Sequence, residues 1–580
     1  GIVGMVTYAY NDCTAVFDGN ASNLGAIYAE NGSYLGGILG GLSGGNNNLN
    51  YVGTLSFGGK GTLLNEGNLS GQSQMGGIFG GIIRNYNGSV SVVFEGKAVN
   101  TGAIEGRAGS IGGIGGNIAL TNNTANLEQA GALTLGGIWE NAGSVSGAGS
   151  YVGGNLGYAN FTASAATLAD AGTFTLSGTW TNTGSVTNVG SSYTGGNIGT
   201  LSATSPVNDM VAFVMEENTV LQNDASVTAG GYTGGNLGYF NWNAASTTAA
   251  TPEALSFRGN WSNTGRIVSS GSNVGGNLGY LGWNAAAMTA GANAASLLGV
   301  WSNTGSVECT GGSVGGNIGV LYAKPGADDV LSFEIGAEIR NTGMLTATGS
   351  YAGGIFGRAY SDTKSARIKV SGRLENTAGV TKQSGNYTGG IFGGVGNNAT
   401  VMMSITVEES GSIANGGKVA GFQYTGGMAG IFCGDLAANG VIENRGAVSG
   451  TSDTAGFAGY HAGSVTSEAA TARILIYGSV TGTSSVGLYY GRRAAALDEG
   501  SYGIFAAYVT FGLGSDTSGI SVTIDGTVYT TDESGIFRNA SREALTVALG
   551  DFTLNQYTAA LASDFEKTID YTFGDVAAQF

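Results

Sequence analysis

The chain has 580 residues, of which 108 are glycine and 3 are proline, and its formal net charge is −17. Glycine does not recur at every third position and proline is scarce, which excludes collagen, while an apolar content of 42% argues against simple disorder. Because charged residues make up only 11% of the chain and are mostly acidic, we expect neither nucleic acid nor an anionic membrane as a partner.

The cysteines and the apolar segments limit the possibilities further. Cys13, Cys309 and Cys433 show no metal-ligand spacing, so we expect buried free thiols, no disulfide framework and no metal site. There is no run of 18 apolar residues, and hence no predicted membrane span. No secretory leader is visible, and since the chain begins with Gly1 we expect a processed or excised form. Gly-x-Gly-x-x-Gly matches carry no weight at this glycine content, and no cofactor is expected.

The first residues resemble the end of a repeat whose first half is missing. Gly1, Ile2 and Val3 begin a short apolar run that follows a Gly-Gly pair in later copies. The chain is therefore expected to open inside a coil, with an unpaired strand edge that could serve as an assembly edge.

From there the sequence is organised by a repeated phrase, whose clearest copy is WSNTGRIVSSGSNVGGNLG at 261–279. It contains an Asn-Thr-Gly turn, a short alternating strand, a polar bend and a Gly-Gly pair that leads into another strand. The phrase returns about every 36–42 residues, a period typical of solenoids, propellers or arrays. The clearest Gly corners are Gly153, Gly154, Gly195, Gly196, Gly275, Gly276, Gly315 and Gly316; degenerate copies follow at Ala455–Gly456, Val486–Gly487 and Ser534–Gly535.

Each unit is predicted to contain three short strands, because its period-2 runs are bounded by Gly, Asn and Ser. Examples of the three are Leu255–Phe257, Arg266–Ile267 and Asn277–Tyr280, and Arg473–Tyr477 is assigned to the first kind. About fourteen such units are too many for one propeller, which leaves an all-β solenoid. Longer connections are expected as loops stacked on one side of the rod, at Ala159–Asp170, Thr200–Asn208 and Asn241–Pro252.

Identical positions in a solenoid form columns, and three columns are predicted to pack the rod. The first is an asparagine ladder, in which stacked amides hydrogen-bond up and down the column. The second is a shorter asparagine column just after the Gly pair, and the third is a column of tryptophans. Their members are Asn65, Asn100, Asn141, Asn182, Asn223, Asn263, Asn303, Asn341, Asn376, Asn415 and Asn444; Asn155, Asn197, Asn236, Asn277 and Asn317; and Trp139, Trp180, Trp261 and Trp301.

The last part of the chain departs from the repeat. Residues 1–500 are assigned to the solenoid, and 501–580 to irregular coils and a C-terminal cap or junction. This part includes a helix-like segment at Tyr557–Glu566.

The phrase N-x-G-x-V followed by G-G-hydrophobic-x-G resembles the GLUG repeat of bacterial surface proteins. Asn341–Leu345 with Gly353–Gly357 is a good match, and the likeness covers most of residues 20–490. In this chain Asn often follows the Gly pair, where the repeat usually has an apolar residue. The resemblance implies a right-handed parallel β-helix of the kind found in secreted adhesins and autotransporter passengers.

β-Helices also occur in polysaccharide-active enzymes, so catalytic residues were sought. Arg367–Lys369 is similar to the Arg-Ile-Lys element of polygalacturonases, but the three-Asp cluster and the Gly-His-Gly of those enzymes are missing. The single histidine, His461, has no Asp or Cys at a recognisable spacing. The acidic pairs Glu216–Glu217 and Asp328–Asp329 have no nearby basic residue. We therefore predict no catalytic residues, and an ice-binding threonine column is likewise not sustained.

The favoured function is a non-enzymatic rod on the bacterial cell surface, which is adhesive and structural and presents its loops. Its expected partners are host or neighbouring-cell glycans or proteins, or copies of itself. Two alternatives stay open: a self-assembling filament subunit joined through the open first coil, and a β-helical polysaccharide-active enzyme.

Overall fold

The computed structural model describes most of the chain. The described residues are 2–8, 13–44, 53–57, 61–86, 90–122, 132–163, 172–190, 192–205, 212–244, 255–285, 294–325, 330–363, 366–398, 401–467, 473–487 and 489–493, followed by 505–507, 511–512, 521–524, 527–531, 537–538, 540–541, 548–549, 552–553 and 559–560.

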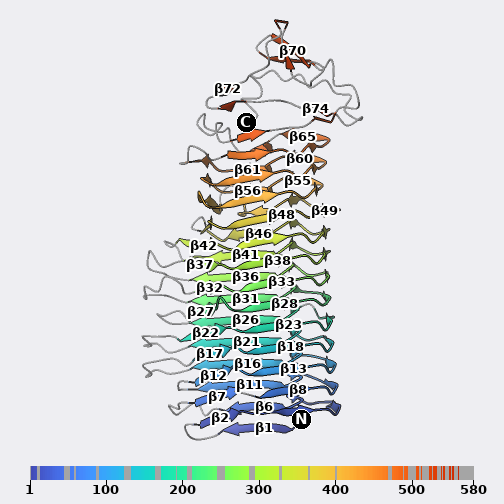
Figure 1. Ribbon diagram of the computed structural model, residues 1–580, viewed down its shortest axis with the longest axis vertical. Helices are drawn as coiled ribbons and strands as arrows, with labels where there is room; N and C mark the ends of the chain where they lie inside the picture. Colours follow the sequence, from blue (N-terminus) through green and yellow to red (C-terminus); the bar gives the residue numbers. More distant parts are fainter. Residues whose placement is uncertain are drawn as a thin grey trace.

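The chain forms a parallel β-solenoid, drawn as a tall rod in Figure 1. Each coil of about 39 residues contributes one short strand to each of five sheets. One coil illustrates the order: β35 (Asn273–Gly275), β36 (Leu278–Ala285), β37 (Ala294–Leu297), β38 (Val300–Asn303) and β39 (Val307–Cys309). We call the sheets that contain these strands E, A, B, C and D, respectively. The predicted all-β parallel solenoid is confirmed, whereas three strands per coil is wrong, because there are five.

The sheets have 13 or 14 strands each, and neighbouring strands come from successive coils. Their first and last strands are β1 (Val3–Tyr8) and β66 (Tyr490–Arg493) in sheet A, β2 (Cys13–Phe17) and β62 (Val465–Thr466) in B, β3 (Ala21–Asn23) and β67 (Phe505–Ala507) in C, β4 (Ile27–Tyr28) and β64 (Val480–Thr481) in D, and β5 (Leu35–Gly36) and β65 (Ser484–Gly487) in E.

The two sheets that the sequence did not predict have very short strands. Sheet C runs through the Trp-Ser-Asn residues before the turn, and sheet E ends at the first glycine of the Gly pair. In the sequence the sheet-C residues adjoin the Asn-Thr-Gly turn and the sheet-E residues fall in the polar bend before the Gly pair, so both segments resemble connections and not strands. The sheet-A strands are in contrast longer than predicted: Ala159–Ala163, Thr200–Ser205 and Asn241–Ala244 belong to strands instead of loops. The remainder of each predicted loop lies outside the described residues.

The register differs from the predicted alignment near the C-terminal end. Gly487 pairs with Ala455, so it is the first residue of its corner and not the second. β63 (Arg473–Ile476) lies in sheet C, not in the sheet of Leu255–Phe257. Of the predicted helix at 557–566, Ala559–Ala560 form the strand β74 and the other residues lie outside the described part, as does Ser534–Gly535.

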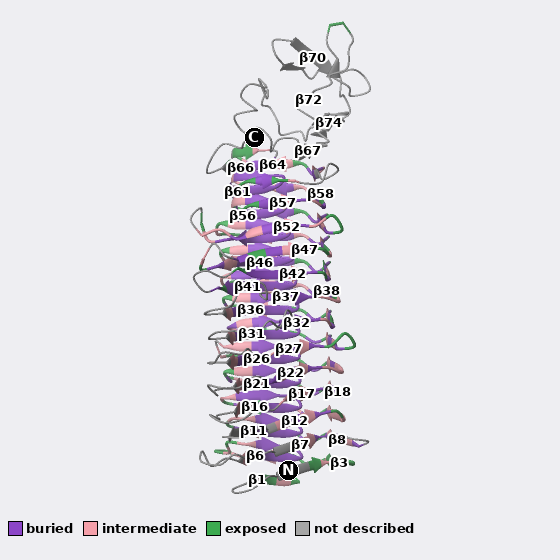
Figure 2. Cartoon of the chain, turned by 90° about the vertical axis from the view of Figure 1, so that its left-hand side faces the viewer, coloured by how far each residue is buried: buried purple, intermediate pink, exposed green. Residues whose placement is uncertain are grey.

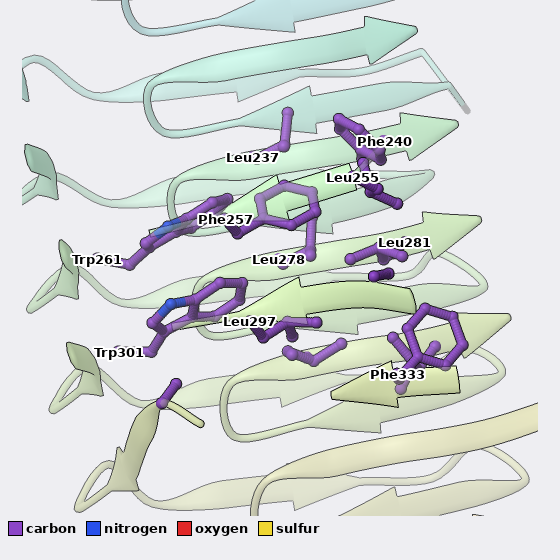
Figure 3. Close-up of a cluster of buried hydrophobic side chains, with 14 of the residues drawn as sticks. Leu237, Phe240, Leu255, Phe257, Trp261, Leu278, Leu281, Leu297, Trp301 and Phe333 are labelled. Carbon is purple, nitrogen blue, oxygen red and sulfur yellow. The ribbon is translucent and has the colours of Figure 1, made fainter. Parts of the chain in front are cut away.

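The interior of the rod is one continuous apolar core that extends from coil to coil. Inward side chains of sheets A, B and C fill it, as Figure 3 shows for Phe240, Phe257, Trp261 and Trp301. A second, narrower cluster lies between sheets D and E. Figure 2 shows the strands as a buried column along the rod. Because each coil covers the next, the core grows with coil number instead of closing into separate domains.

Candidate functional site

The long asparagine ladder is a continuous column of hydrogen bonds. Each side-chain Nδ2 donates to the Oδ1 of the asparagine in the next coil, at 2.6–2.9 Å from Asn23 through Asn444. The same Nδ2 donates to a backbone carbonyl two residues ahead, at 2.8–3.1 Å. Both amide protons are thus used, which makes burial of these side chains affordable. Ile476 takes the next position, and the column ends there.

The Gly pairs are required because the backbone passes too close to this ladder and to the neighbouring coil to leave room for a Cβ. A Cβ on Gly235 would lie 2.0 Å from the carbonyl oxygen of Gly276 and 2.4 Å from Cγ of Asn263. At Gly234, the first glycine of the pair, a Cβ would lie 2.0 Å from the carbonyl oxygen of Leu237. The same close contacts recur at Gly153, Gly154, Gly195, Gly196, Gly275, Gly276, Gly315 and Gly316. The corner thus needs glycine for space and not for a left-handed backbone, since none of these residues has a positive φ.

The second asparagine column fills the corner between sheets E and A in five coils. Asn155, Asn197, Asn236 and Asn277 each donate Nδ2 to the next Oδ1 in the column, which ends at Asn317, at 2.6–2.7 Å. Nδ2 also donates to a backbone carbonyl across the coil, such as Ser262 O for Asn236, at 2.9 Å. Apolar residues take the same position on either side, Ile114 before the column and Ile355 after it. The column therefore ends against apolar side chains, and Oδ1 of Asn155 has no hydrogen-bond partner among the described residues.

The predicted tryptophan column consists of two separate pairs. Trp139 stacks on Trp180 with ring centroids 4.1 Å apart, and Trp261 stacks on Trp301 at 4.4 Å. Leu221 lies in register between the pairs. All four indoles are buried inside the rod, so they pack the core and cannot meet a ligand.

The residues considered for catalysis do not come together. Arg367 is exposed on β47 (Ala366–Val370) of sheet B, and Lys369 pairs with Glu408 at 3.5 Å. His461 is fully buried in sheet A between the rings of Phe432 and Tyr490. Glu216 and Glu217 are exposed in a turn four sheet-B strands away from β47, and Asp328–Asp329 lie outside the described residues. Within the described part of the chain, no group of three or more His, Cys, Asp or Glu could hold a metal ion.

Two thiols and one amine are buried: Cys309 and Lys382 lie on sheet D, and Cys433 lies on sheet A. Burial raises the pKa of Cys309 and of Cys433 to about 11, so both are thiols at neutral pH, whereas the side chain of Cys13 is not described. Burial lowers the pKa of Lys382 to about 7. Its Nζ donates to the backbone oxygens of Ser350 at 2.5 Å and Tyr387 at 3.2 Å. Two thiols and one amine, in different coils, do not form a catalytic set.

The residues of the predicted assembly edge belong to the first coil of the described chain. Strands β1 to β5 pair only with the strands of the following coil. Ile2 is 57% exposed and Met5 47% exposed, and Val3 is half-buried, while nothing is described for Gly1. Of the predicted assembly edge, Val3 therefore begins β1, which pairs with β6 (Leu39–Gly44), and Ile2 precedes it with an exposed apolar side chain.

A feature that the sequence analysis missed is a strip of tyrosines on the outside of sheets E and A. The rings contact one another from coil to coil with centroids 4.3–6.2 Å apart, and Arg358 links the two halves by lying over Tyr351 and Tyr360. Every ring is half-buried. The tyrosine strip consists of Tyr151, Tyr158, Tyr193, Tyr232, Tyr239, Tyr280, Tyr322, Tyr351, Tyr360, Tyr387, Tyr424 and Tyr460.

A signal for the tyrosine strip exists in the sequence. Tyr151 and Tyr158 flank the corner VGGNLG, and Tyr232 and Tyr239 flank TGGNLG. The first tyrosine of each pair ends up on sheet E and the second on sheet A. Their rings meet only because the Gly pair turns the chain between the two sheets, which spacing alone does not reveal.

The part of the tyrosine strip in the middle coils (residues 151–323) is uncharged. The strands of sheets E and A contain no Asp, Glu, Lys or Arg between Tyr151 and Ala323. Burial raises the pKa of Tyr193, Tyr239 and Tyr280, and neighbouring tyrosines add to the effect. Burial also raises the pKa of Tyr158, partly offset by a hydrogen bond with Ser202. These phenols are therefore neutral at physiological pH and can act as hydrogen-bond donors.

No protein family, no curated protein and no solved structure matches this chain. The described residues also contain no helix that is long and apolar enough to cross a membrane.

Proposed function

We propose that this protein is a non-enzymatic rod on the outside of a bacterial cell, with an adhesive and structural role. The observation that carries the proposal is the unbroken stack of coils, in which every coil is bonded to its neighbours through five sheets and an asparagine ladder. Such a stack holds surface groups at a fixed distance from one end. A right-handed winding and kinship with GLUG-repeat surface proteins belong to the same proposal, and their support is the repeated N-x-G-x-V phrase.

The non-enzymatic part of the proposal is supported by the dispersal of the reactive side chains. In the described residues the basic, acidic and imidazole groups considered above lie on different sheets or in different coils, or are buried in the core. A surface depression of about 300 Å³ has walls of small polar residues; they are Thr310, Gly311, Gly312, Thr348, Gly349, Ser350, Gly385 and Asn386. A general acid paired with a base, as polysaccharide cleavage requires, is not assembled there.

The test is binding of the purified, labelled chain to host epithelial cells and to bacterial cells, with heat-unfolded protein as the control. Saturable binding of the folded chain alone is expected, with no release of reducing sugar from polysaccharides incubated with or without Ca²⁺. Absence of binding to every cell type would refute the adhesive role. Robust glycan cleavage would establish the enzyme alternative instead.

A second candidate is a filament subunit, favoured by the exposed apolar side chains of Ile2 and Met5 in the first coil. An open edge that meets the other end of a second copy makes a contact that does not close, and such contacts produce fibres. Negative-stain images at low concentration distinguish isolated rods from fibres. If fibres form through this edge, Met5→Lys shortens them, because a charge on the outer strand opposes pairing.

A further inference from the structure

We propose that the outward face of sheets E and A in the middle coils binds a neutral polysaccharide chain that lies along the rod. This inference rests on the adhesive function proposed above, and it names the surface and the ligand class.

The chemistry of the face is the first argument. Its outward positions on sheet A carry phenol, amide and hydroxyl groups in three parallel columns. Tyrosine provides a large, rigid contact area with a polar tip, and Asn, Ser and Thr provide adaptable hydrogen bonds, which is the composition of many binding surfaces. The residues of these columns are Tyr158, Thr200, Tyr239 and Tyr280; Asn160, Ser202, Asn241 and Gly282; and Thr162, Thr204, Asn243 and Asn284.

The face is also ordered before any ligand arrives. Tyr239 stacks on Tyr280 with centroids 5.0 Å apart and an angle of 8° between the rings, and Tyr193 contacts Tyr239 at 4.3 Å. Gly282 leaves the space beside Tyr280, since a Cβ there would lie 2.5 Å from Cε1 of that ring. Ser202 donates to Asn160 Oδ1 at 2.8 Å. Because these side chains are already held in place, binding would cost little further conformational entropy.

Charge selects the class of ligand. The net charge of −17 repels polyanions, and the sheet-E and sheet-A strands from β20 (Tyr151–Gly153) to β36 contain no Lys or Arg that could bind an acidic sugar; the first basic residue is Lys324, in register with Asn284 at the end of β41 (Ile318–Lys324). A neutral sugar matches the face, because its C–H surfaces pack against ring edges and faces while its hydroxyl groups bond to phenol and amide groups. Successive coils are about 4.8 Å apart, close to the length of one pyranose unit, so equivalent groups repeat along an extended glycan.

The test is affinity electrophoresis of the full chain in gels that contain either neutral polysaccharides (dextran, glucomannan, arabinoxylan) or acidic ones (polygalacturonate, alginate). At least one neutral polysaccharide is expected to retard the protein, and the acidic ones are expected not to. The double variant Tyr239→Ser/Tyr280→Ser should weaken that retardation about tenfold or more, the loss expected from removing two aromatic contacts. Tyr477→Ser is the matched control, because Tyr477 is also half-buried but lies beyond sheet C, against Arg445.

A second variant guards against misfolding of the double variant. Gly282→Asn keeps every tyrosine but displaces the ring of Tyr280, and it should reduce retardation while circular dichroism stays unchanged. The inference is overturned if no neutral polysaccharide retards the chain, if acidic ones retard it more, or if folded variants of the face bind as well as Tyr477→Ser does. Cell binding that survives the tyrosine variants would refute this face alone and leave the adhesive role standing. If polysaccharides retard the protein but it binds no cells, the adhesive role is refuted and the binding face is kept.

Discussion

The middle coils (residues 151–323) and the later coils (residues 324–476) build the same solenoid with different side chains. The middle coils contain 9 charged residues and the later coils contain 23. The middle coils fill the corner of sheets E and A with asparagines, whereas the later coils use Ile355, Ile391, Met428 and Phe457 there. The long asparagine ladder and the Gly pairs pass through both regions.

The comparison separates what the coil requires from what it tolerates. The corner and the long ladder fix the backbone, and they vary only near the C-terminal end of the later coils, where Ala455 replaces the first glycine of a corner and Ile476 replaces the asparagine. The second column and the outer surface point into space that either apolar or polar groups can fill, and the tryptophan positions accept other apolar side chains, such as Leu221 and Ile339. An uncharged outer face is therefore a property of the middle coils and not of the fold.

The largest expected effect is that of a methyl group in the corner. Gly235→Ala in the middle coils and Gly390→Ala in the later coils should each lower the free energy of unfolding by about 3 kcal/mol or more, because Cβ would overlap a backbone oxygen 2.0 or 2.1 Å away. Thermal denaturation measures both. Gly379→Ala, where the nearest atom is 3.9 Å away, should change little. Unequal losses in the two regions would contradict a shared corner.

Removal of one amide from the long ladder should have the next largest effect. Asn263→Ala leaves Oδ1 of Asn303 without its donor and takes the acceptor from Asn223, which should cost about 2–4 kcal/mol. Chemical denaturation gives the value, with Asn376→Ala as the equivalent change in the later coils. A cost below 1 kcal/mol (roughly) in either region would show that the ladder is not a source of stability.

The second column should respond in a non-additive way. Asn236→Ile alone takes the donor from Asn277 and the acceptor from Asn197, and should cost about 1–3 kcal/mol. Replacement of all five asparagines by Ile should cost much less than five times the single loss, because it removes the side-chain donors and acceptors of the column together, leaves only the bonds to backbone carbonyls unmade, and reproduces the corner of the later coils. If the fivefold variant lost about five times the stability of the single variant, the corner of the middle coils could not be exchanged for that of the later coils.

Lys382 should make the later coils sensitive to pH. Burial lowers its pKa to about 7, so between pH 7 and 9.5 the unfolded chain binds a proton at this residue that the folded chain does not. The stability contributed at this site therefore rises with pH, by at most about 1.4 kcal/mol per pH unit. Lys382→Met, compared with the parent chain by denaturation across this range, should lack that rise. A parallel pH dependence of the two proteins would refute the assignment.

The smallest effect is expected from the exposed ion pairs. Arg266 and Glu308 lie 2.7 Å apart in neighbouring coils, with 57% and 43% of their side chains exposed. Arg266→Ala should cost no more than about 1 kcal/mol, and less in high salt, because water and salt screen the pair. Lys369→Ala in the later coils, which removes the pair with Glu408, should cost a similarly small amount of stability. A larger loss in either variant would mean that charge matters more to this rod than the comparison suggests.

The sequence predicts the framework well because the framework repeats. Asn263 and Gly276 recur at fixed offsets, and any residue that must meet its own copy in the next coil leaves a regular spacing. The short strands of sheets C and E were missed because they adjoin the Asn-Thr-Gly turn and the Gly pair, and their Asn, Ser and Gly residues are typical of turns. The tyrosine strip was missed for a different reason. Tyr232 and Tyr239 lie seven residues apart on different sheets, and only the folded corner brings their rings together.

The amides of the long ladder all point the same way. From Asn23 onward each Nδ2 donates to the Oδ1 of the coil that follows, as far as Asn444. The first asparagine of the column therefore offers an acceptor, its Oδ1, and the last one offers a donor, its Nδ2. A segment equal to one whole coil can be duplicated or deleted without leaving any of these groups unmatched, whereas a change of half a coil cannot. Genes for such proteins can therefore lengthen or shorten the rod in steps of one repeat, and the distance between the two ends of the rod becomes a quantity that selection can adjust by counting.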